Sequence, residues 1–201
     1  MAGDAFIEAL SIVPLIHLPV VPNQRVLLVG VDAAAAAPAV LRYPQTIEVV
    51  IVGAGDRPAV LGDKRVKYAP SIEALPKEWM ADLIIVALPV ITDAKVQAIR
   101  THHRADSGAA VFAVARASQV RAAKDMIRRG WSTVQPYREM TPEVEDPTAR
   151  VAWFLLAGDH GFKRHRAVPP WAKRMSDKYV PALFTLAKDE YALAYGGAAN
   201  G

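Results

Sequence analysis

Short runs of large aliphatic residues alternate with segments of helical character, and this alternation constrains the fold more than any other feature of the chain. Uninterrupted apolar runs of four to seven residues are typical of parallel strands buried on both faces. The pattern predicts a doubly wound α/β sheet. The expected strands are residues 25–30, 47–52, 66–69, 83–87 and 109–115, and the expected helices are 32–43, 92–104 and 118–129, with a helical turn at 71–75.

The alternation changes after Gly130. Residues 131–137 and 150–157 form two long apolar stretches with no helical segment between them. This predicts an antiparallel hairpin at the edge of a mostly parallel sheet, as in methyltransferase-like rather than dehydrogenase-like Rossmann folds. A short amphipathic helix is expected near residues 176–186, ahead of a tail rich in Gly and Ala.

The length of 201 residues fits one domain. We predict that residues 1–24 lead into an α/β core at 25–157 and that residues 158–201 form a basic extension. The net charge of +4 is unevenly spread, since residues 1–90 carry seven Lys or Arg against nine Asp or Glu, and residues 91–201 carry 17 against 11. The basic half is suited to solvent, an acidic partner or nucleic acid.

Composition excludes several classes of protein. The chain has no cysteine, so it forms no disulfide, no thiolate nucleophile and no Cys-ligated metal site. The N-terminus lacks the basic patch of a secretory signal peptide. The apolar stretch at residues 12–21 is interrupted by Pro14, His17 and Pro19 and is shorter than the roughly 20 residues needed to cross a bilayer. We predict a soluble protein with no membrane contact, cytoplasmic or within a virus particle.

Several short motifs occur in an order and spacing that carry a resemblance. They are Glu8-Ala9-Leu10, residues 14–19 and 25–32, Arg42-Tyr43-Pro44, residues 81–86, Phe162-Lys163-Arg164, Met175-Ser176 and Ala182-Leu183-Phe184. Together they resemble the spermidine synthase (aminopropyltransferase) family, whose fold is that of the class I AdoMet-dependent methyltransferases. The resemblance covers most of the chain and implies that fold here.

The resemblance also implies a glycine-dense loop after the first strand, where the backbone approaches the cofactor closely. Gly30 and Asp32 fit that loop. The family has an acid that binds the ribose hydroxyls after the second strand, but Gly53 stands there and Asp56 is the nearby acid. Side chains that would crowd a ligand stand where the family has glycines: Val29, Val31, Ala33 and Ala34.

The fourth strand lacks the acid that the family's chemistry uses. In the family, an aspartate-rich loop follows this strand, and its first acid deprotonates the attacking amine. The corresponding residue is Ala87, followed by Leu88-Pro89-Val90, and none of these side chains accepts a proton. We predict no catalytic residue and no cofactor. Gly30, Asp32 and Asp56 are the cofactor-binding candidates if a pocket for AdoMet or decarboxylated AdoMet is retained.

The basic extension interleaves cations with aromatic residues. Such a patch can hold phosphate or single-stranded nucleic acid by charge and stacking, although an inherited surface segment explains it equally simply. No metal site is predicted, because the adjacent His102 and His103 diverge on a helix and have no carboxylate at metal spacing. The cations of the predicted basic patch are Lys163, Arg164, Arg166, Lys173 and Arg174.

Three functions are consistent with these residues. The first is a non-catalytic, structural or assembly subunit that contacts other protein chains in an oligomer or larger complex, a virus particle among them. The second is an aminopropyl- or methyltransferase with a remodelled site, in which Asp93 is the nearest acid downstream of Ala87. The third is a regulatory module that binds a nucleoside without chemistry.

Overall fold

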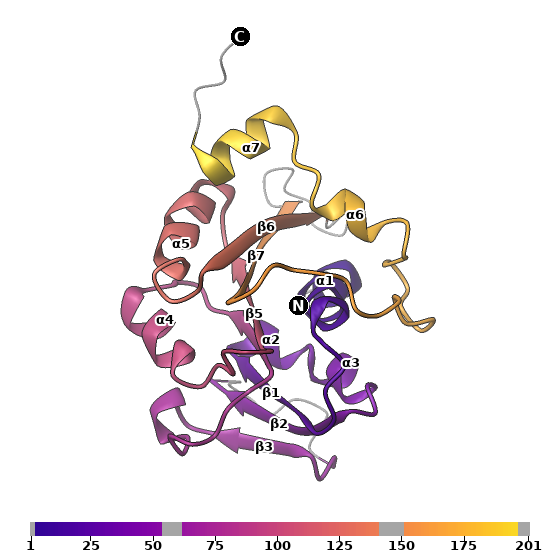
Figure 1. Ribbon diagram of the computed structural model, residues 1–201, viewed down its shortest axis with the longest axis vertical. Coiled ribbons are helices and arrows are strands. Elements are labelled where there is room, and N and C mark those ends of the chain that lie inside the picture. Colours follow the sequence, from indigo (N-terminus) through magenta and orange to yellow (C-terminus); the bar gives the residue numbers. More distant parts are fainter. Residues whose placement is uncertain (1–2, 54–61, 141–150, 197–201) are drawn as a thin grey trace.

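One seven-stranded sheet forms the centre of the molecule (Figure 1). A computed structural model describes residues 3–53, 62–140 and 151–196. The sheet order is β3-β2-β1-β4-β5-β7-β6, and neighbours are parallel except for the antiparallel pairs β5–β7 and β6–β7. This confirms the predicted sheet and its C-terminal hairpin. The strands are β1 (Gln24–Val29), β2 (Thr46–Val52), β3 (Val66–Ala69), β4 (Leu83–Ala87), β5 (Ala109–Val114), β6 (Thr133–Met140) and β7 (Val151–Gly158).

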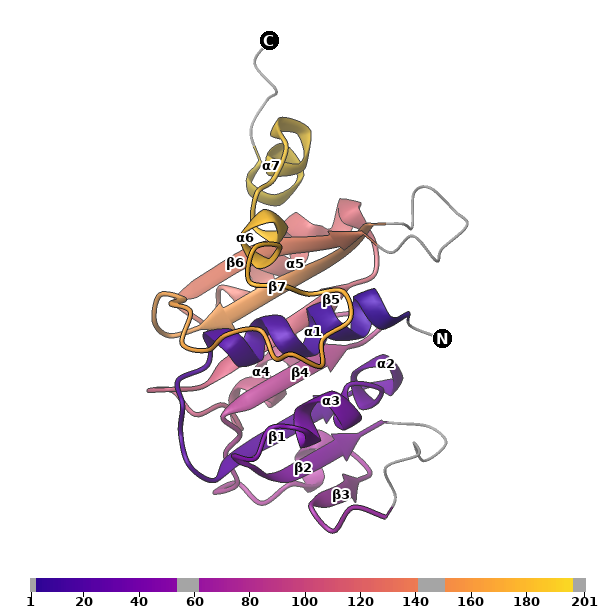
Figure 2. The same ribbon diagram turned by 90° about the vertical axis from the view of Figure 1, so that its right-hand side faces the viewer.

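Helices cover both faces of the sheet (Figure 2). One face carries α1 (Asp4–His17), α2 (Val31–Ala34), α3 (Ala37–Leu41) and α6 (Val180–Leu183). The other face carries α4 (Asp93–Arg100), α5 (Val120–Ile127) and α7 (Lys188–Tyr195), with the 3-10 turns η1 (Ile72–Ala74) and η2 (Ala117–Gln119). Within the described residues, no helix is both long and apolar enough to span a membrane.

The central strands are apolar on both faces because two cores lie against them. In β1, Leu28 belongs to the core beneath α1, and Leu27 belongs to the core beneath α4 and α5. This division follows from the alternation of side chains along a strand. Both leucines and their β4 partners, Ile84 and Ile85, are fully buried. The uninterrupted aliphatic runs of the sequence are therefore the consequence of burial on two sides.

The first helix was not expected from the sequence, which predicted only a lead-in. α1 continues through Pro14, and nearly all of its length is buried. The C-terminal extension lies across it, and the buried Glu8 carboxylate accepts hydrogen bonds from the backbone N–H groups of Lys173, Arg174 and Met175 at 2.6, 2.8 and 2.9 Å. α1 is thus held between the sheet and a segment about 165 residues away in sequence.

Other elements differ in extent from the prediction. The helix expected at residues 32–43 is divided into α2 and α3, because Pro38 occupies the first turn of α3, where a missing N–H breaks no intrahelical bond. The helix expected at 176–186 is limited to α6, and α7 lies where the sequence predicted a tail. The division of the chain into lead-in, core and extension stays a prediction.

A close backbone contact joins the ends of β1 and β4. Gly30 follows β1 with φ 100° and ψ 163°, a conformation almost restricted to glycine. Its N–H donates to the carbonyl of Val52 at 2.9 Å. A Cβ placed on Gly30 would lie 2.1 Å from the carbonyl oxygen of Ala87. The turn into α2 therefore presses against the end of β4.

This contact predicts a large loss of stability in Gly30→Ala. Backbone strain at this φ,ψ costs about 1–3 kcal/mol, and overpacking adds about 1–3 kcal/mol. Gly53→Ala is a matched control, since Gly53 also has a positive φ of 67° but its Cβ would meet no described atom within 4 Å. In urea unfolding, we expect Gly30→Ala to lose at least about 2 kcal/mol more than Gly53→Ala. Equal losses would contradict the contact.

Candidate functional site

The carboxyl edge of the sheet, where β1, β2, β4 and β5 end, is where doubly wound folds bind ligands. The order reverses between β1 and β4, so Gly30 and Ala87 meet at the topological switch point. Asp32 lies next to Gly30, exposed on α2, and makes no hydrogen bond or ion pair with a described residue. The structure thus places Gly30 against Ala87, with Asp32 two residues further along the chain, whereas Asp56 lies outside the described residues. A cofactor-binding role for Gly30, Asp32 and Asp56 stays a prediction.

Apolar side chains line the space beside this switch point. A pocket of about 170 Å³ opens between the ends of β4 and β5, and Gln119 is its one polar side chain among the described residues. The loop after β4 contributes Leu88, Pro89, Val90 and Ile91 to its lining. The acid next along the chain, Asp93, pairs with Arg129 at 2.8 Å on the surface. The described part of this pocket therefore offers no general base.

The predicted basic patch is largely engaged in holding the extension to the rest of the molecule. Arg164 pairs with Asp177. Arg166 donates to the carbonyl of Pro19 at 3.2 Å, and Lys173 pairs with Asp4 at 2.8 Å. Two further cations of the patch, Lys163 and Arg174, are exposed. The five side chains do not form one uniform cationic surface, because Arg164, Arg166 and Lys173 are held by partners within the protein.

The aromatic residues near this patch are also engaged. Arg166 lies over the ring of Tyr43 at 5.6 Å, and Tyr43 meets Trp171 edge to face at 5.9 Å. Arg42 lies over the ring of Trp171 at 5.0 Å. Burial raises the pKa of Tyr43 to about 12. These rings stack on arginines of the same chain, a geometry that stabilises the extension and leaves less ring surface for nucleic-acid bases.

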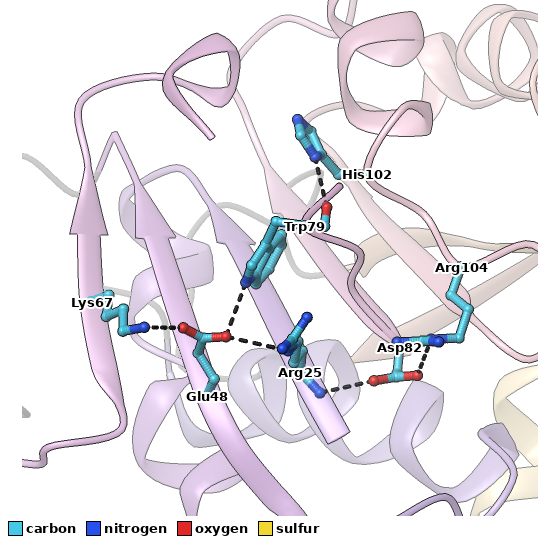
Figure 3. Close-up of polar contacts among 7 residues, drawn as sticks. All are labelled: Arg25, Glu48, Lys67, Trp79, Asp82, His102 and Arg104. Carbon is cyan, nitrogen blue, oxygen red and sulfur yellow. Dashed lines mark hydrogen bonds and ion pairs between the residues drawn. The ribbon is translucent and has the colours of Figure 1, made fainter. Parts of the chain in front are cut away.

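The opposite, amino edge of the sheet carries a network of charges that sequence reasoning missed (Figure 3). Asp82, buried just before β4, accepts a hydrogen bond from the backbone N–H of Arg25 at 2.9 Å and forms an ion pair with Nε of Arg104 at 2.7 Å. Its own N–H donates to the carbonyl of Arg25 at 2.9 Å. The available signal was a single acid placed before an aliphatic run.

Glu48 is the second carboxylate of this network. Its Oε1 pairs with Lys67, and its Oε2 accepts from Nε1 of Trp79 at 2.9 Å and lies 3.4 Å from Nε of Arg25 (Figure 3). Burial acts to raise the pKa of Glu48, but the hydrogen bonds from Lys67 and Trp79 outweigh it and leave the pKa below its usual value. Glu48 is therefore held as an anion beside Lys67 and Arg25.

A third polar cluster lies between α4 and the end of β7. Arg100 donates to Nδ1 of His103 at 2.5 Å and pairs with Asp159 at 2.7 Å. Because arginine donates, Nδ1 accepts and the imidazole is neutral. Burial, and next the Arg100 charge, lower the pKa of His103 to about 4, against an opposing effect of Asp159. Among the described residues, no group of three or more His, Asp or Glu side chains is placed to hold a metal ion.

Comparison with known proteins gives matches in fold. No protein-family model and no curated protein sequence matches the chain. A spermidine synthase in complex with the transition-state analogue AdoDATO matches with a TM-score of 0.81 at 13% identity, over 96% of this chain and 74% of that one. The spermidine synthase of Thermotoga maritima matches with a TM-score of 0.80 at 14% identity and the same coverage.

A methyltransferase-like protein matches more distantly. Human methyltransferase-like protein 13, in complex with SAH, gives a TM-score of 0.57 at 12% identity over 80% of this chain and 84% of that one. At these identities the likeness shows the fold. The chain has the class I methyltransferase fold, similar in form to that of spermidine synthase, and the predicted fold resemblance is confirmed.

The low pKa of His103 predicts a specific pH dependence of stability. Its pKa is about 4 in the folded chain and 6.5 as a free side chain, so only the unfolded chain takes up this proton between those values. The free energy of unfolding should fall by about 3 kcal/mol on this account as the pH drops from 6.5 to 4. In His103→Gln, urea unfolding at a series of pH values should show a shallower fall. The same slope in both proteins would contradict the assignment.

Proposed function

We propose that this chain is a non-catalytic domain of methyltransferase fold that serves as a structural or assembly subunit through contacts with other protein chains. The observation that carries the proposal is the end of β4, where Ala87 meets Gly30 and an apolar pocket follows. Proton transfer requires a general base within hydrogen-bond reach of the reacting group. Where a base is needed, the described structure has Ala87, which offers only its methyl side chain and its backbone carbonyl.

Exposed valines beside the same contact support a role in protein–protein contact. Val31, directly after Gly30, is 61% exposed, and Val90, three residues after Ala87, is 59% exposed. Large apolar side chains gathered at one edge of a fold mark interaction surfaces. A partner that covered both valines and entered the adjoining pocket would remove this apolar surface from water.

A remodelled transferase or a nucleoside-binding module is the alternative, and one feature favours it. Gly30, in a conformation almost restricted to glycine, and the exposed Asp32 stand at the two positions that fit the family's cofactor loop. The acid available for proton transfer, Asp93, is paired with Arg129, so turnover through Asp93 would require that ion pair to open. The geometry favours the non-catalytic role.

Calorimetric titration tests the proposal directly. AdoMet, decarboxylated AdoMet and methylthioadenosine should each give no saturable heat with the chain, since the adjoining pocket is lined by apolar side chains and Gln119 and holds no carboxylate for the ribose hydroxyls or the amine. Micromolar binding of any of the three would overturn the assignment as a structural or assembly subunit. Product formed from a bound ligand would indicate the transferase, and binding without product the nucleoside module.

The contact role makes a separate prediction about assembly. Native mass measurement of the chain isolated from its source should give a complex of several chains, and Val90→Asp should release the chain because it places a charge in an apolar interface. Val20→Asp is the matched control, since Val20 is equally exposed at 59% but precedes β1 at the other edge. A monomeric wild-type chain, or equal effects of the two variants, would contradict the role.

A further inference from the structure

The amino edge of the sheet contains a hollow of about 380 Å³ beside the charge network. Its polar lining residues are Asn23, Arg25, Asp82, Arg104 and Ser107. We propose that this amino-edge hollow binds a small organic oxyanion, a phosphate ester or a carboxylate, with an apolar body. The proposal is independent of the function assigned to the carboxyl edge, since the two features lie at opposite ends of the same strands.

The two arginines have donors to spare. Asp82 holds Nε of Arg104, and Glu48 lies near Nε of Arg25, but the terminal guanidinium nitrogens of both arginines make no hydrogen bond to a described residue. The side chains of Arg25 and Arg104 are 39% and 45% exposed. Guanidinium groups match the planar, two-oxygen geometry of carboxylates and phosphates. The hollow therefore presents two unfilled oxyanion donors.

The local charge balance favours an anion. Three cations, Arg25, Lys67 and Arg104, face two carboxylates, Glu48 and Asp82, which leaves one positive charge in excess (Figure 3). Both carboxylates already accept hydrogen bonds from these cations. The Asp82 charge is offset by its ion pair with Arg104 at 2.7 Å, which also fixes the orientation of the Arg104 guanidinium.

The other wall of the hollow suits an apolar group. Val21, Pro22 and Ile47 line it, and Ile47 is 43% exposed. Asn23, with a φ of 60°, forms the tight turn that carries Val21 and Pro22 over the start of β1. Ser107 has a hydroxyl without a hydrogen-bond partner among the described residues, and it lies on the polar side. A ligand with an anionic head and a small apolar body meets both walls.

Amide chemical shifts of the isotopically labelled full chain provide the test, at fixed ionic strength. The probes are phenyl phosphate, benzoate and, as the uncharged control, phenol. At least one of the two anions should shift the amides of Asn23, Arg25 and Ser107 saturably, and phenol should not. Binding of phenyl phosphate alone, benzoate alone or both supports the site and identifies its anion class. Absence of a saturable shift with either anion would overturn it.

Two variants and one control separate a built site from general attraction to a basic protein. Arg104→Gln should weaken anion binding at least tenfold. Arg128→Gln makes the same change of net charge at an exposed position on the far side of α5 and should change binding less than twofold. Ile47→Asp places a carboxylate at the rim and should also weaken binding at least tenfold, even if Arg104→Gln does not fold. Equal weakening by Arg104→Gln and Arg128→Gln would refute the site.

Discussion

The buried carboxylate of Asp82 aligns the three central strands. This carboxylate accepts a hydrogen bond from the backbone N–H of Arg25 in β1, and the Asp82 backbone N–H donates to the Arg25 carbonyl. The Asp82 carbonyl accepts a hydrogen bond from the N–H of Ala109 at the start of β5. Because these strands are parallel, the alignment of their first residues also determines the alignment of their last residues. Gly30 meets Ala87 at the carboxyl edge as a consequence of the register set at the amino edge.

The sheet could be predicted from the sequence because burial on two faces leaves a local record. Continuous aliphatic runs such as residues 83–87 occur where a strand has a core on each side. α1 leaves no such record. Pro14 argues against a helix locally, and the helix is held by the bonds of Glu8 to backbone groups near Met175, which no local pattern reveals. Tertiary contact overrides propensity there.

Only part of the candidate site could be predicted from the sequence, for the same reason. The positions of Gly30 and Ala87 at strand ends follow from the sequence pattern, whereas their mutual contact depends on the sheet order. The amino-edge network was missed because Arg25 and Asp82 are 57 residues apart and each is an ordinary charged residue beside an aliphatic run. In the basic extension, the sequence predicted a feature that the contacts modify. The number of cations predicted a basic patch, but that number does not reveal that Arg166 and Lys173 have partners within the protein.

The two edges of the sheet have opposite chemistry, and their separation has a functional consequence. Buried apolar side chains fill the central strands between the two edges. A change of charge at one edge therefore affects the other edge mainly through the alignment of the strands. The alanine at the end of β4 is therefore compatible with an intact charge network at the amino edge. The anion site that we propose at the amino edge is compatible with an apolar pocket after β4, because the contacts that position Arg25 and Arg104 do not involve Ala87.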